Sequence, residues 1–386
     1  MGRAVVEGLA DGSERLASVA GRELCLTAVA VRDVAKARAA RIPESVLTDA
    51  PAHVVADPGI DVLVELIGGL EPARTLIAAA LGAGKPVVTA NKTVVAAFGS
   101  ELETISRRTG AALRFEAAVG GGIPVLGPLA TDLAGNDIRR VRGIVNGTTN
   151  HILSAMAGEG RSYDEVLREA QELGYAEADP SGDVEGDDPA NKLVILARLA
   201  FGVWLSPGSV VRRPPAIDGA GKPGITGVGA DDMAAAAQLG LTIKLLATAE
   251  RGDEGIAAGV LPTAVEAASA IGATDGVTNR IEVDAVPLGT VGFSGPGAGG
   301  AATSSAVLGD LVAIAQGLGS TWAGLPPAIT ADPGDMAADP FDKPRAWFAR
   351  GTDGEPIRTD IVSLAEARRA LRGRVADGAT FYPIDA

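Results

Sequence analysis

Residues 62–92, VLVELIGGLEPARTLIAAALGAGKPVVTANK, contain two short β-branched runs, 62–67 and 86–89, separated by an Ala-rich stretch of helical character. A strand, a helix and a second strand in this order form a βαβ unit with parallel strands. Similar runs at residues 24–31 and 112–116 continue the pattern on either side. The sequence therefore predicts an α/β fold with a Rossmann-like, doubly wound parallel sheet that helices cover on both faces.

The predicted strands end in polar residues or glycines. Ligands of doubly wound sheets bind at the carboxyl ends of the strands. The ends in this chain are Arg32 and Asp33, Gly68 and Gly69, Asn91 and Lys92, and Glu116. This edge of the sheet is the predicted site for a dinucleotide.

The first strand of the pattern is missing. A Rossmann half should open with a strand and a G-x-G-x-x-G loop, whose amides meet a pyrophosphate. Residues 1–6, MGRAVV, match only the end of such a loop and the start of its helix, with Gly2 in the third glycine position. Either translation starts upstream of Met1 or the strand is lost. We expect the first, because losing a central strand would expose two sheet edges; the upstream reading frame tests this.

Composition limits the possible partners and the compartment. A chain of 386 residues that is 47% hydrophobic can form two domains, and its net charge of −14 argues against nucleic acid or an anionic membrane as partner. The single cysteine, Cys25, excludes an internal disulfide and is predicted to be a small buried side chain in a reducing compartment. With only two histidines, His53 and His151, no zinc site or nucleophilic triad is expected. No apolar run approaches the ~20 residues of a membrane span, so the protein is predicted to be cytoplasmic.

Residues beyond 124 have a different character. They predict a more antiparallel second sheet with strands at 137–145, 256–260 and 280–287, and helices at 150–156, 162–172, 191–201 and 231–250. Helices are also expected at 304–316 and 364–375. We expect a dinucleotide-binding domain at 1–124 to which 295–322 returns, a second domain at 125–294, and an extension of unknown role at 325–386.

Residues 174–192, GYAEADPSGDVEGDDPANK, gather carboxylates on a turn-rich loop that leads into an apolar helix. Asp187 and Asp188 are predicted N-caps, and Pro189 suits the first helical position. Lys192 lies four residues after Asp188, where a carboxylate can hold an ammonium and partial burial would suit proton transfer. From spacing alone, a solvated Asp–Lys pair on a capped helix is the better interpretation of the pattern.

Five motifs together resemble the homoserine dehydrogenase family. They occur in family order across residues 2–322: TANK at 89–92, EAAVGGGIP at 116–124, GIVNGTTNHI at 143–152, the acidic stretch 174–192, and GPGAGG at 295–300. The resemblance implies NAD(P)H-dependent, reversible reduction of L-aspartate 4-semialdehyde to L-homoserine, on the route to threonine and methionine. It also implies that residues 125–294 form a substrate-binding and dimerisation domain, and that the protein is a homodimer or homotetramer. No regulatory amino-acid-binding domain is recognisable after residue 325, so feedback by threonine is not predicted.

The resemblance also implies roles for individual residues. Lys192 and Lys92 would polarise the aldehyde oxygen and transfer a proton to it, supported by Asp188; the sequence does not decide which lysine donates. Substrate contacts would come from Glu177, Asp183, Asp188, Tyr175 and Thr148. Cofactor contacts would come from Gly2, Arg32, Arg38, Thr89, Lys92, Gly174, Gly297 and Gly299. A monovalent cation, expected to be sodium, would lie among the Glu116 carboxylate and the carbonyls of Glu116, Val119, Gly121 and Ile123.

Two matters stay open at this point. Asp33 would favour the ribose of NAD, whereas Arg32 and Arg38 would accommodate the 2′-phosphate of NADP; we expect NADP because two guanidiniums flank one carboxylate. Alternatives to the expected activity are a dehydrogenase of another small amino-acid aldehyde and a catalytically silent homologue that binds or scaffolds.

Overall fold

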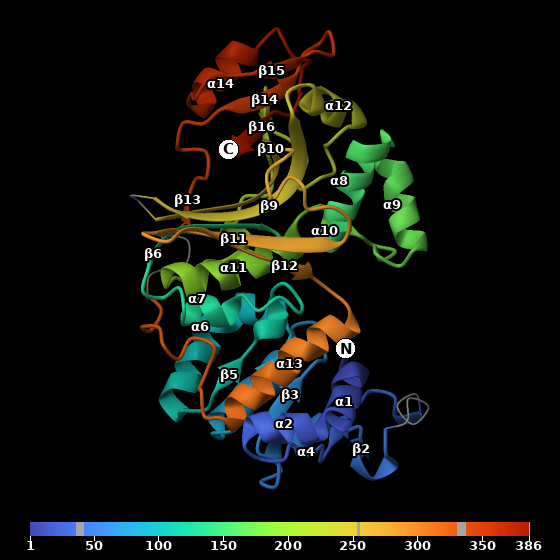
Figure 1. Cartoon of the computed structure of the whole chain (residues 1–386), viewed down its shortest axis with the longest axis vertical. Coiled ribbons are helices and arrows are strands. Elements are labelled where there is room, and N and C mark those ends of the chain that lie inside the picture. Colours follow the sequence, from blue (N-terminus) through green and yellow to red (C-terminus); the bar gives the residue numbers. More distant parts are fainter. Residues whose placement is uncertain (36–41, 253–254, 330–336, 386) are drawn as a thin grey trace. The chain divides into compact units, whose positions relative to one another are not determined.

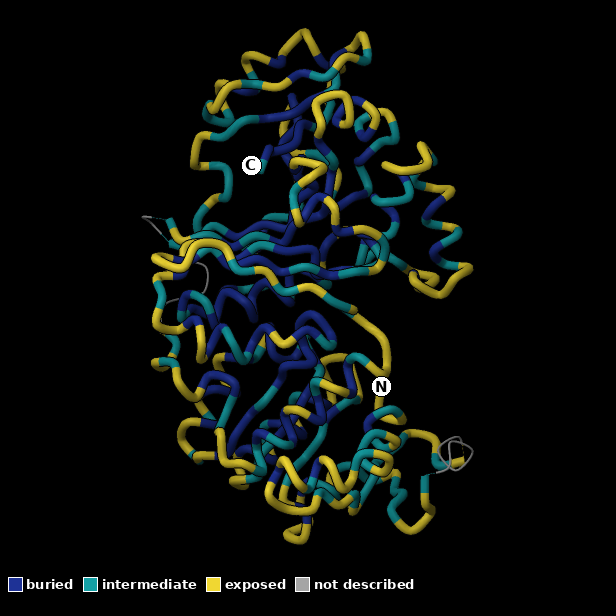
Figure 2. The backbone as a smooth tube through the Cα atoms, in the orientation of Figure 1, coloured by how far each residue is buried: buried dark blue, intermediate teal, exposed yellow. Residues whose placement is uncertain are grey.

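The computed structural model describes residues 1–35, 42–252, 255–329 and 337–385 (Figure 1). The chain forms two compact units: Met1–Gly135 with Ala298–Ile329, and Asn136–Gly297 with Thr330–Ala386. Residues 125–135 thus group with the first unit, and the C-terminal segment groups with the second. Each unit contains its own buried core (Figure 2).

The first unit consists of short parallel strands and helices. Its strands are β1 (Val29–Ala30), β2 (Leu47–Thr48), β3 (Leu63–Glu65), β4 (Val87–Thr89) and β5 (Leu113–Arg114). Its helices are α1 (Gly2–Asp11), α2 (Ser13–Ala20), α4 (Pro51–Ala56), α5 (Ala73–Gly82), α6 (Lys92–Thr109), α7 (Leu126–Ala130) and α13 (Gly300–Ala315), with short 3-10 turns η1 (Glu44–Val46) and η2 (Glu116–Ala118). Strands β3, β4 and β5 form one parallel sheet in sequential order, which confirms the predicted βαβ arrangement.

The first predicted strand is much shorter than expected. Of residues 24–31, only Val29–Ala30 pairs, and it pairs with β2 in a separate two-stranded parallel sheet. Residues 24–28 have no assigned strand partner, so alternate side chains face solvent. Cys25 is consequently exposed, and its predicted burial was wrong.

The core of the first unit joins sheet and helices from distant parts of the sequence. Val5 of α1, Val88 of β4 and Leu308 of α13 belong to one buried cluster. Burying such aliphatic side chains is worth roughly 1.5–3 kcal/mol each. The helix predicted at 304–316 therefore packs on this unit, as expected from the returning segment.

The second unit is built on a large mixed sheet. Its strands are β6 (Asp137–Ile144), β7 (Pro215–Ala216), β8 (Gly219–Ala220), β9 (Leu241–Arg251), β10 (Ile256–Glu266), β11 (Thr278–Val286), β12 (Gly289–Pro296), β13 (Ala337–Ala338), β14 (Trp347–Arg350), β15 (Pro356–Arg358) and β16 (Tyr382–Asp385). Its helices are α8 (Gly147–Glu159), α9 (Tyr163–Glu172), α10 (Ser181–Val184), α11 (Asp187–Phe201), α12 (Ala230–Gln238) and α14 (Leu364–Leu371), with a 3-10 turn η3 (Pro207–Ser209). The order of the sheet is β12-β11-β6-β9-β10-β16-β14-β15, with β13 paired to β10, and most neighbours are antiparallel as predicted.

The helix predicted at 231–250 was wrong in its second half. Helix α12 ends at Gln238, Gly240 adopts a left-handed φ of 69°, and the next residues form strand β9. All eleven residues of β9 pair with β10. Most side chains on both faces of β9 are buried, so the polar alternation that marks a half-buried strand is absent.

The C-terminal segment also differs from expectation. The extension after residue 325 was predicted to contain a helix at 364–375 and no strands were expected in it, yet β14, β15 and β16 extend the main sheet. Helix α14 stops at Leu371, close to Gly373, whose φ is 76°. Trp347 and Phe381 pack edge to face, 5.3 Å apart, in the cluster that covers this part of the sheet.

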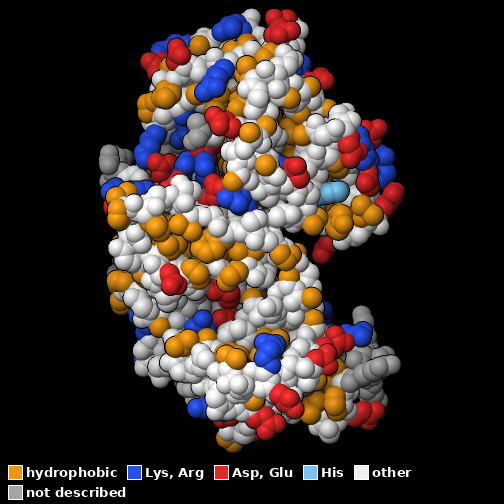
Figure 3. All heavy atoms as spheres, viewed as in Figure 1, with side chains coloured by type: hydrophobic (Ala, Val, Ile, Leu, Met, Phe, Trp, Pro, Cys, Tyr) orange, Lys and Arg blue, Asp and Glu red, His pale blue; other side chains and the backbone are white. Residues whose placement is uncertain are grey.

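Within the described ranges, no helix combines the length and apolarity needed to cross a bilayer. On the face shown in Figure 3, basic and acidic side chains are interspersed. That face therefore presents no continuous basic surface of the kind that binds nucleic acid.

Candidate functional site

Lys192 and Asp188 form a buried ion pair in the second unit. Lys192 Nζ donates to Asp188 Oδ2 at 2.7 Å and to the carbonyl of Val145, at the end of β6, at 2.6 Å. The lysine is only 8% exposed. An ammonium has three N–H groups, and these two acceptors account for two of them. The pairing predicted from the four-residue spacing is confirmed, and the third N–H can serve a ligand oxygen.

The start of α11 differs in detail from the prediction. Gly186, with φ 94°, is the N-cap, so Asp187 and Asp188 are the first two helical residues and Pro189 is the third. Proline is tolerated there because the first four N–H groups of a helix have no partner within it. Both aspartates still lie in the first turn, where the helix dipole favours negative charge.

Asn146 connects this pair to a second carboxylate. Its Nδ2 donates to Asp183 Oδ1 at 2.7 Å and to Asp188 Oδ2 at 2.8 Å. Asn146 is the N-cap of α8, Asp183 belongs to α10 and Asp188 to α11, so three helix ends meet here. We call Asn146, Asp183, Asp188 and Lys192 the amine–acid cluster.

The other predicted substrate residues of this unit lie at the start of α8 and on the turn after α9. Thr148 Oγ1 donates to the carbonyl of Tyr175 at 2.8 Å, and the Tyr175 ring contacts His151 edge-on at 5.1 Å. Tyr175 is 46% exposed. Glu177 is exposed, and Gly174 turns the chain with φ 74°. Tyr175 and Thr148 are thus brought together, with side chains open to a ligand.

Polar side chains bind the carboxyl ends of β3 and β4 to each other in the first unit. Thr89 Oγ1 donates to Glu65 Oε2 at 2.6 Å and accepts from the amide of Asn91 at 3.0 Å. Asn91 caps α6 and donates to the carbonyl of Gly69 at 2.8 Å. Thr89 is fully buried, so its side chain holds this turn. Lys92, partly exposed, is the first residue of α6.

Two helix N-termini of the first unit lie next to each other. Helix α1 begins at Gly2 and α13 at Gly300, and a Cβ on Gly300 would lie 3.6 Å from the Cβ of Ala4. Both ends carry positive partial charge and unpaired amides, which suits a pyrophosphate. Arg32 and Asp33 are exposed just after β1. Arg38 lies outside the described residues.

The glycine segment 295–300 crosses from one unit to the other. Gly297 ends its part of the second unit, where a Cβ would overlap the buried side-chain amide of Asn279. Gly299, the N-cap of α13 in the first unit, has φ 108°, which side chains rarely adopt. Both positions therefore require glycine for local reasons.

The Glu116 loop is organised by its carboxylate. Oε1 accepts from the amides of Val125 and Leu126 at 2.7 and 2.8 Å, and Oε2 accepts from the amide of Gly127 at 2.8 Å. Burial, and then the neighbouring Asp310, raise the pKa of Glu116. A carboxylate has about four lone-pair sites, so one on Oε2 remains after these three bonds.

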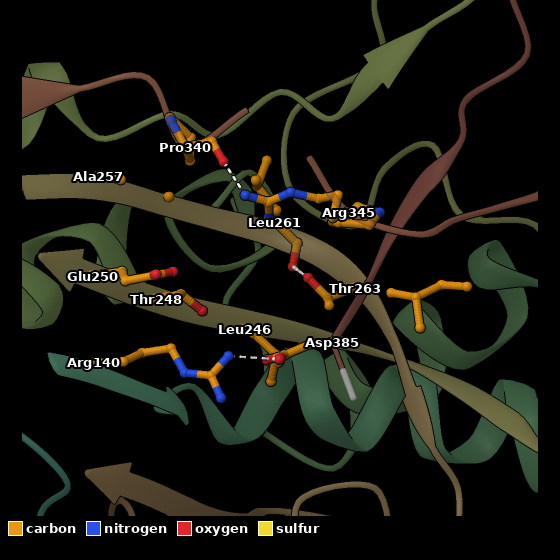
Figure 4. A pocket seen from close by; sticks show the side chains of 13 residues that line it. Arg140, Leu246, Thr248, Glu250, Ala257, Leu261, Thr263, Pro340, Arg345 and Asp385 are labelled. Atoms are coloured by element: carbon orange, nitrogen blue, oxygen red, sulfur yellow. Dashed lines mark hydrogen bonds and ion pairs between the residues drawn. The ribbon is translucent and has the colours of Figure 1, made fainter. Parts of the chain in front are cut away.

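A small cavity of about 70 Å³ lies elsewhere in the second unit, along β9, β10 and β16 (Figure 4). Its charged groups already have partners: Arg140 donates to Asp385 at 2.6 Å, and Arg345 donates to the carbonyl of Pro340. The amine–acid cluster contributes no residue to this cavity. We therefore assign it no substrate.

Sequence reasoning missed two residues that organise these regions. Glu65 could have been noticed as a carboxylate inside a β-branched run, which needs a buried partner. Asn146 lies in the motif 143–152 and directly precedes a helix, which is the pattern of an N-cap. Nothing in the sequence placed Asn146 beside Asp183, because that contact spans 37 residues.

The chain is similar to known proteins over most of its length. A family profile described as homoserine dehydrogenase matches residues 124–312, and one described as homoserine dehydrogenase, NAD binding domain, matches residues 1–116. A homoserine dehydrogenase from Synechocystis sp. is 45% identical over 318 residues, covering 81% of this chain and 71% of that protein.

Solved structures give the same result. A homoserine dehydrogenase from Thiobacillus denitrificans aligns with a TM-score of 0.87 and 33% identity, covering 100% of this chain and 95% of that one. A hyperthermophilic archaeal homoserine dehydrogenase in complex with NADPH aligns with a TM-score of 0.65 and 28% identity, covering 81% and 93%. The resemblance seen in the five motifs is confirmed, as is the α/β fold. The chain belongs to the homoserine dehydrogenase family of NAD(P)-dependent oxidoreductases.

Proposed function

We propose that the chain reduces L-aspartate 4-semialdehyde to L-homoserine, reversibly, with the amine–acid cluster as the substrate site. The observation that carries this proposal is the buried Lys192, held by Asp188 and Val145 with one N–H left for a substrate oxygen. Asp183 and Glu177 suit the substrate's ammonium, and the Gly147 and Thr148 amides at the start of α8 suit its carboxylate. The reaction would serve threonine and methionine biosynthesis.

In this mechanism Lys192 acts as general acid. The aldehyde oxygen accepts a hydrogen bond from Nζ, and takes the proton as the carbonyl carbon becomes tetrahedral. Bound NAD(P)H supplies the hydride to that carbon. Asp188 holds Lys192 in place and stabilises its charged form before transfer. Lys92, at the start of α6 in the first unit, remains the other candidate for the proton donor.

The first unit would bind the dinucleotide and the second the substrate. Paired N-termini of α1 and α13 fit the pyrophosphate, and Gly2, Arg32 and Gly299 are the cofactor contacts that we keep in the first unit. Gly174 and Gly297, which belong to the second unit, are kept from the motif resemblance. Arg38, which lies outside the described residues, is retained with Arg32 for the 2′-phosphate. We propose NADPH over NADH, in line with the archaeal relative that was solved with NADPH.

Purified protein should oxidise NADPH when L-aspartate 4-semialdehyde is added, with a higher kcat/KM than for NADH. L-glutamate 5-semialdehyde, one methylene longer, should be a poorer substrate by ~10-fold or more. Faster turnover of the longer aldehyde would make the substrate assignment wrong. Failure to bind either dinucleotide would instead favour the non-catalytic alternative.

We also propose a sodium ion at the Glu116 loop, with the carbonyls of Val119, Gly121 and Ile123 as further ligands. The remaining lone pair on Glu116 Oε2 fits such a role, since hard oxygen ligands suit this ion. Positive φ values at Gly120 and Gly121, 70° and 60°, support a tightly turned loop. The ion would hold the loop together. Sodium should raise the unfolding temperature more than lithium at equal ionic strength.

Assembly and compartment complete the proposal. Strand β12 lies at the edge of the main sheet, and the hairpin that leads into it exposes Val286 and Leu288. Such an edge favours pairing with a second copy, so we propose a homodimer or homotetramer, measurable by sedimentation.

The exposed thiol of Cys25 fits a reducing compartment, and we propose the cytoplasm, which cell fractionation would test.

A further inference from the structure

Asn146 has an amide whose orientation is fixed by the helix that it caps. Its Oδ1 accepts from the Thr149 amide at 2.9 Å and from the Thr149 hydroxyl at 3.1 Å. Since the oxygen faces the helix, both hydrogens of Nδ2 face away from it. Each meets one carboxylate, Asp183 at 2.7 Å and Asp188 at 2.8 Å. The side chain is 6% exposed, so this arrangement is shielded from water.

We propose that Asn146 is a positioning residue for the reaction, which sets the distance between the two carboxylates and keeps them ionised for substrate binding. The inference rests on the proposed function, because Asp183 and Asp188 are assigned there to the substrate. Carboxylates this close to one neutral group would otherwise repel each other or take up a proton. Two charge-assisted N–H bonds oppose both outcomes.

Charged groups on neighbouring elements surround the two carboxylates, and Asn146 is the neutral donor that bonds to both. Lys192 on α11 faces Asp188 but has no bond to Asp183 among the contacts described. Asp187 on the same helix pairs with Arg212 at 2.9 Å, away from the cluster. Glu185, after α10, is exposed and adds a further negative charge nearby. Asn146 carries no charge, so its two N–H bonds oppose the mutual repulsion of Asp183 and Asp188 without adding a charge to the cluster.

The test is Asn146→Ser. Serine keeps an oxygen that can cap α8, but it lacks both N–H donors. We expect kcat/KM to fall ~10-fold and the acidic limb of its pH profile to move up by about one unit, because a carboxylate that loses a donor takes up a proton more readily. KM for the substrate should rise more than kcat falls. Asn146→Asp keeps the shape and adds a charge, so the limb should move further.

Ser162→Ala is the matched control. Ser162 caps α9 in the same unit, in an exposed capping box remote from the cluster. Ser162→Ala should lower the unfolding temperature and leave the acidic limb of the kcat/KM profile unchanged. The positioning role would be overturned if the acidic limb of the kcat/KM profile did not move in Asn146→Ser. It would also be overturned if Asn146→Ser and Ser162→Ala gave the same profile.

A second measurement does not depend on turnover. Carbon-13 carboxyl signals of Asp183 and Asp188 should titrate at higher pH in Asn146→Ser than in the parent chain. Identical titrations would overturn the inference. A parent chain without turnover would reject the proposed function itself, whereas turnover in the parent chain with identical titrations in both proteins would reject only the positioning role.

Discussion

Lys192→Ala should reduce kcat by ~10²-fold or more, because the general acid that protonates the substrate oxygen is removed. Asp188 would also lose the ammonium that lies 2.7 Å from its Oδ2. A buried carboxylate without its partner is costly, so substrate binding should weaken as well. Steady-state kinetics with NADPH measures both effects, provided that circular dichroism shows the variant to be folded.

Two further variants separate chemistry from folding. Lys192→Arg keeps a cation that can pair with Asp188, but a guanidinium does not release its proton, so kcat should stay low. Lys244→Met removes another buried lysine of the same unit, whose Nζ donates to Asp275 at 2.9 Å. That change should lower stability with little loss of kcat. Near-normal turnover in Lys192→Ala, with a loss in Lys92→Ala, would assign the proton to Lys92.

Glu116→Ala should destabilise the first unit by about 3–5 kcal/mol, since two buried amides and one partly buried amide lose their acceptor at once. The amides belong to Val125, Leu126 and Gly127, at the start of α7. Urea unfolding measures the loss. The stabilisation by sodium should also disappear in Glu116→Ala. Glu71→Ala, which removes an exposed carboxylate of the same unit, should leave stability almost unchanged.

The pH dependence of stability gives an independent check on Glu116. Its pKa is raised in the folded chain, first by burial and then by Asp310, so the folded state holds a proton that the unfolded state has already lost. Stability from this group is therefore present at low pH and declines as pH rises above about 4.5 towards the raised value. Glu116→Gln should flatten that decline. A loss below ~1 kcal/mol in Glu116→Ala would show that water replaces the carboxylate.

The local chemistry of the site was largely predictable, whereas contacts over long sequence distances were not. The spacing of Asp188 and Lys192 fixes their pairing on any helix, and the structure contains it. The bond from Lys192 to Val145 joins residues 47 positions apart, and no pattern in the sequence reports it. The same holds for Asn146, whose capping role is local but whose carboxylate partners come from two other helices.

The secondary structure was predictable where the hydrophobic pattern of a segment agrees with the residues that end a helix or a strand. Strands β3 and β4 and helix α11 follow from their apolar runs. Strand β9 was taken as helix because its residues are buried on both faces and follow an Ala-rich helix, although Gly240 marks the break. The strands after residue 337 are short and depend on pairing with distant partners, so only the tertiary structure defines them.

The exposed sulfur of Cys25 makes the chain suitable for site-specific labelling. It is the only cysteine, so a maleimide dye would attach to a single atom in the first unit. The adjacent Glu23 carboxylate raises the pKa of the Cys25 thiol, and the thiolate is the reactive form. Coupling is therefore faster in mildly alkaline buffer, and the attached fluorophore would report dinucleotide binding without any engineered substitution.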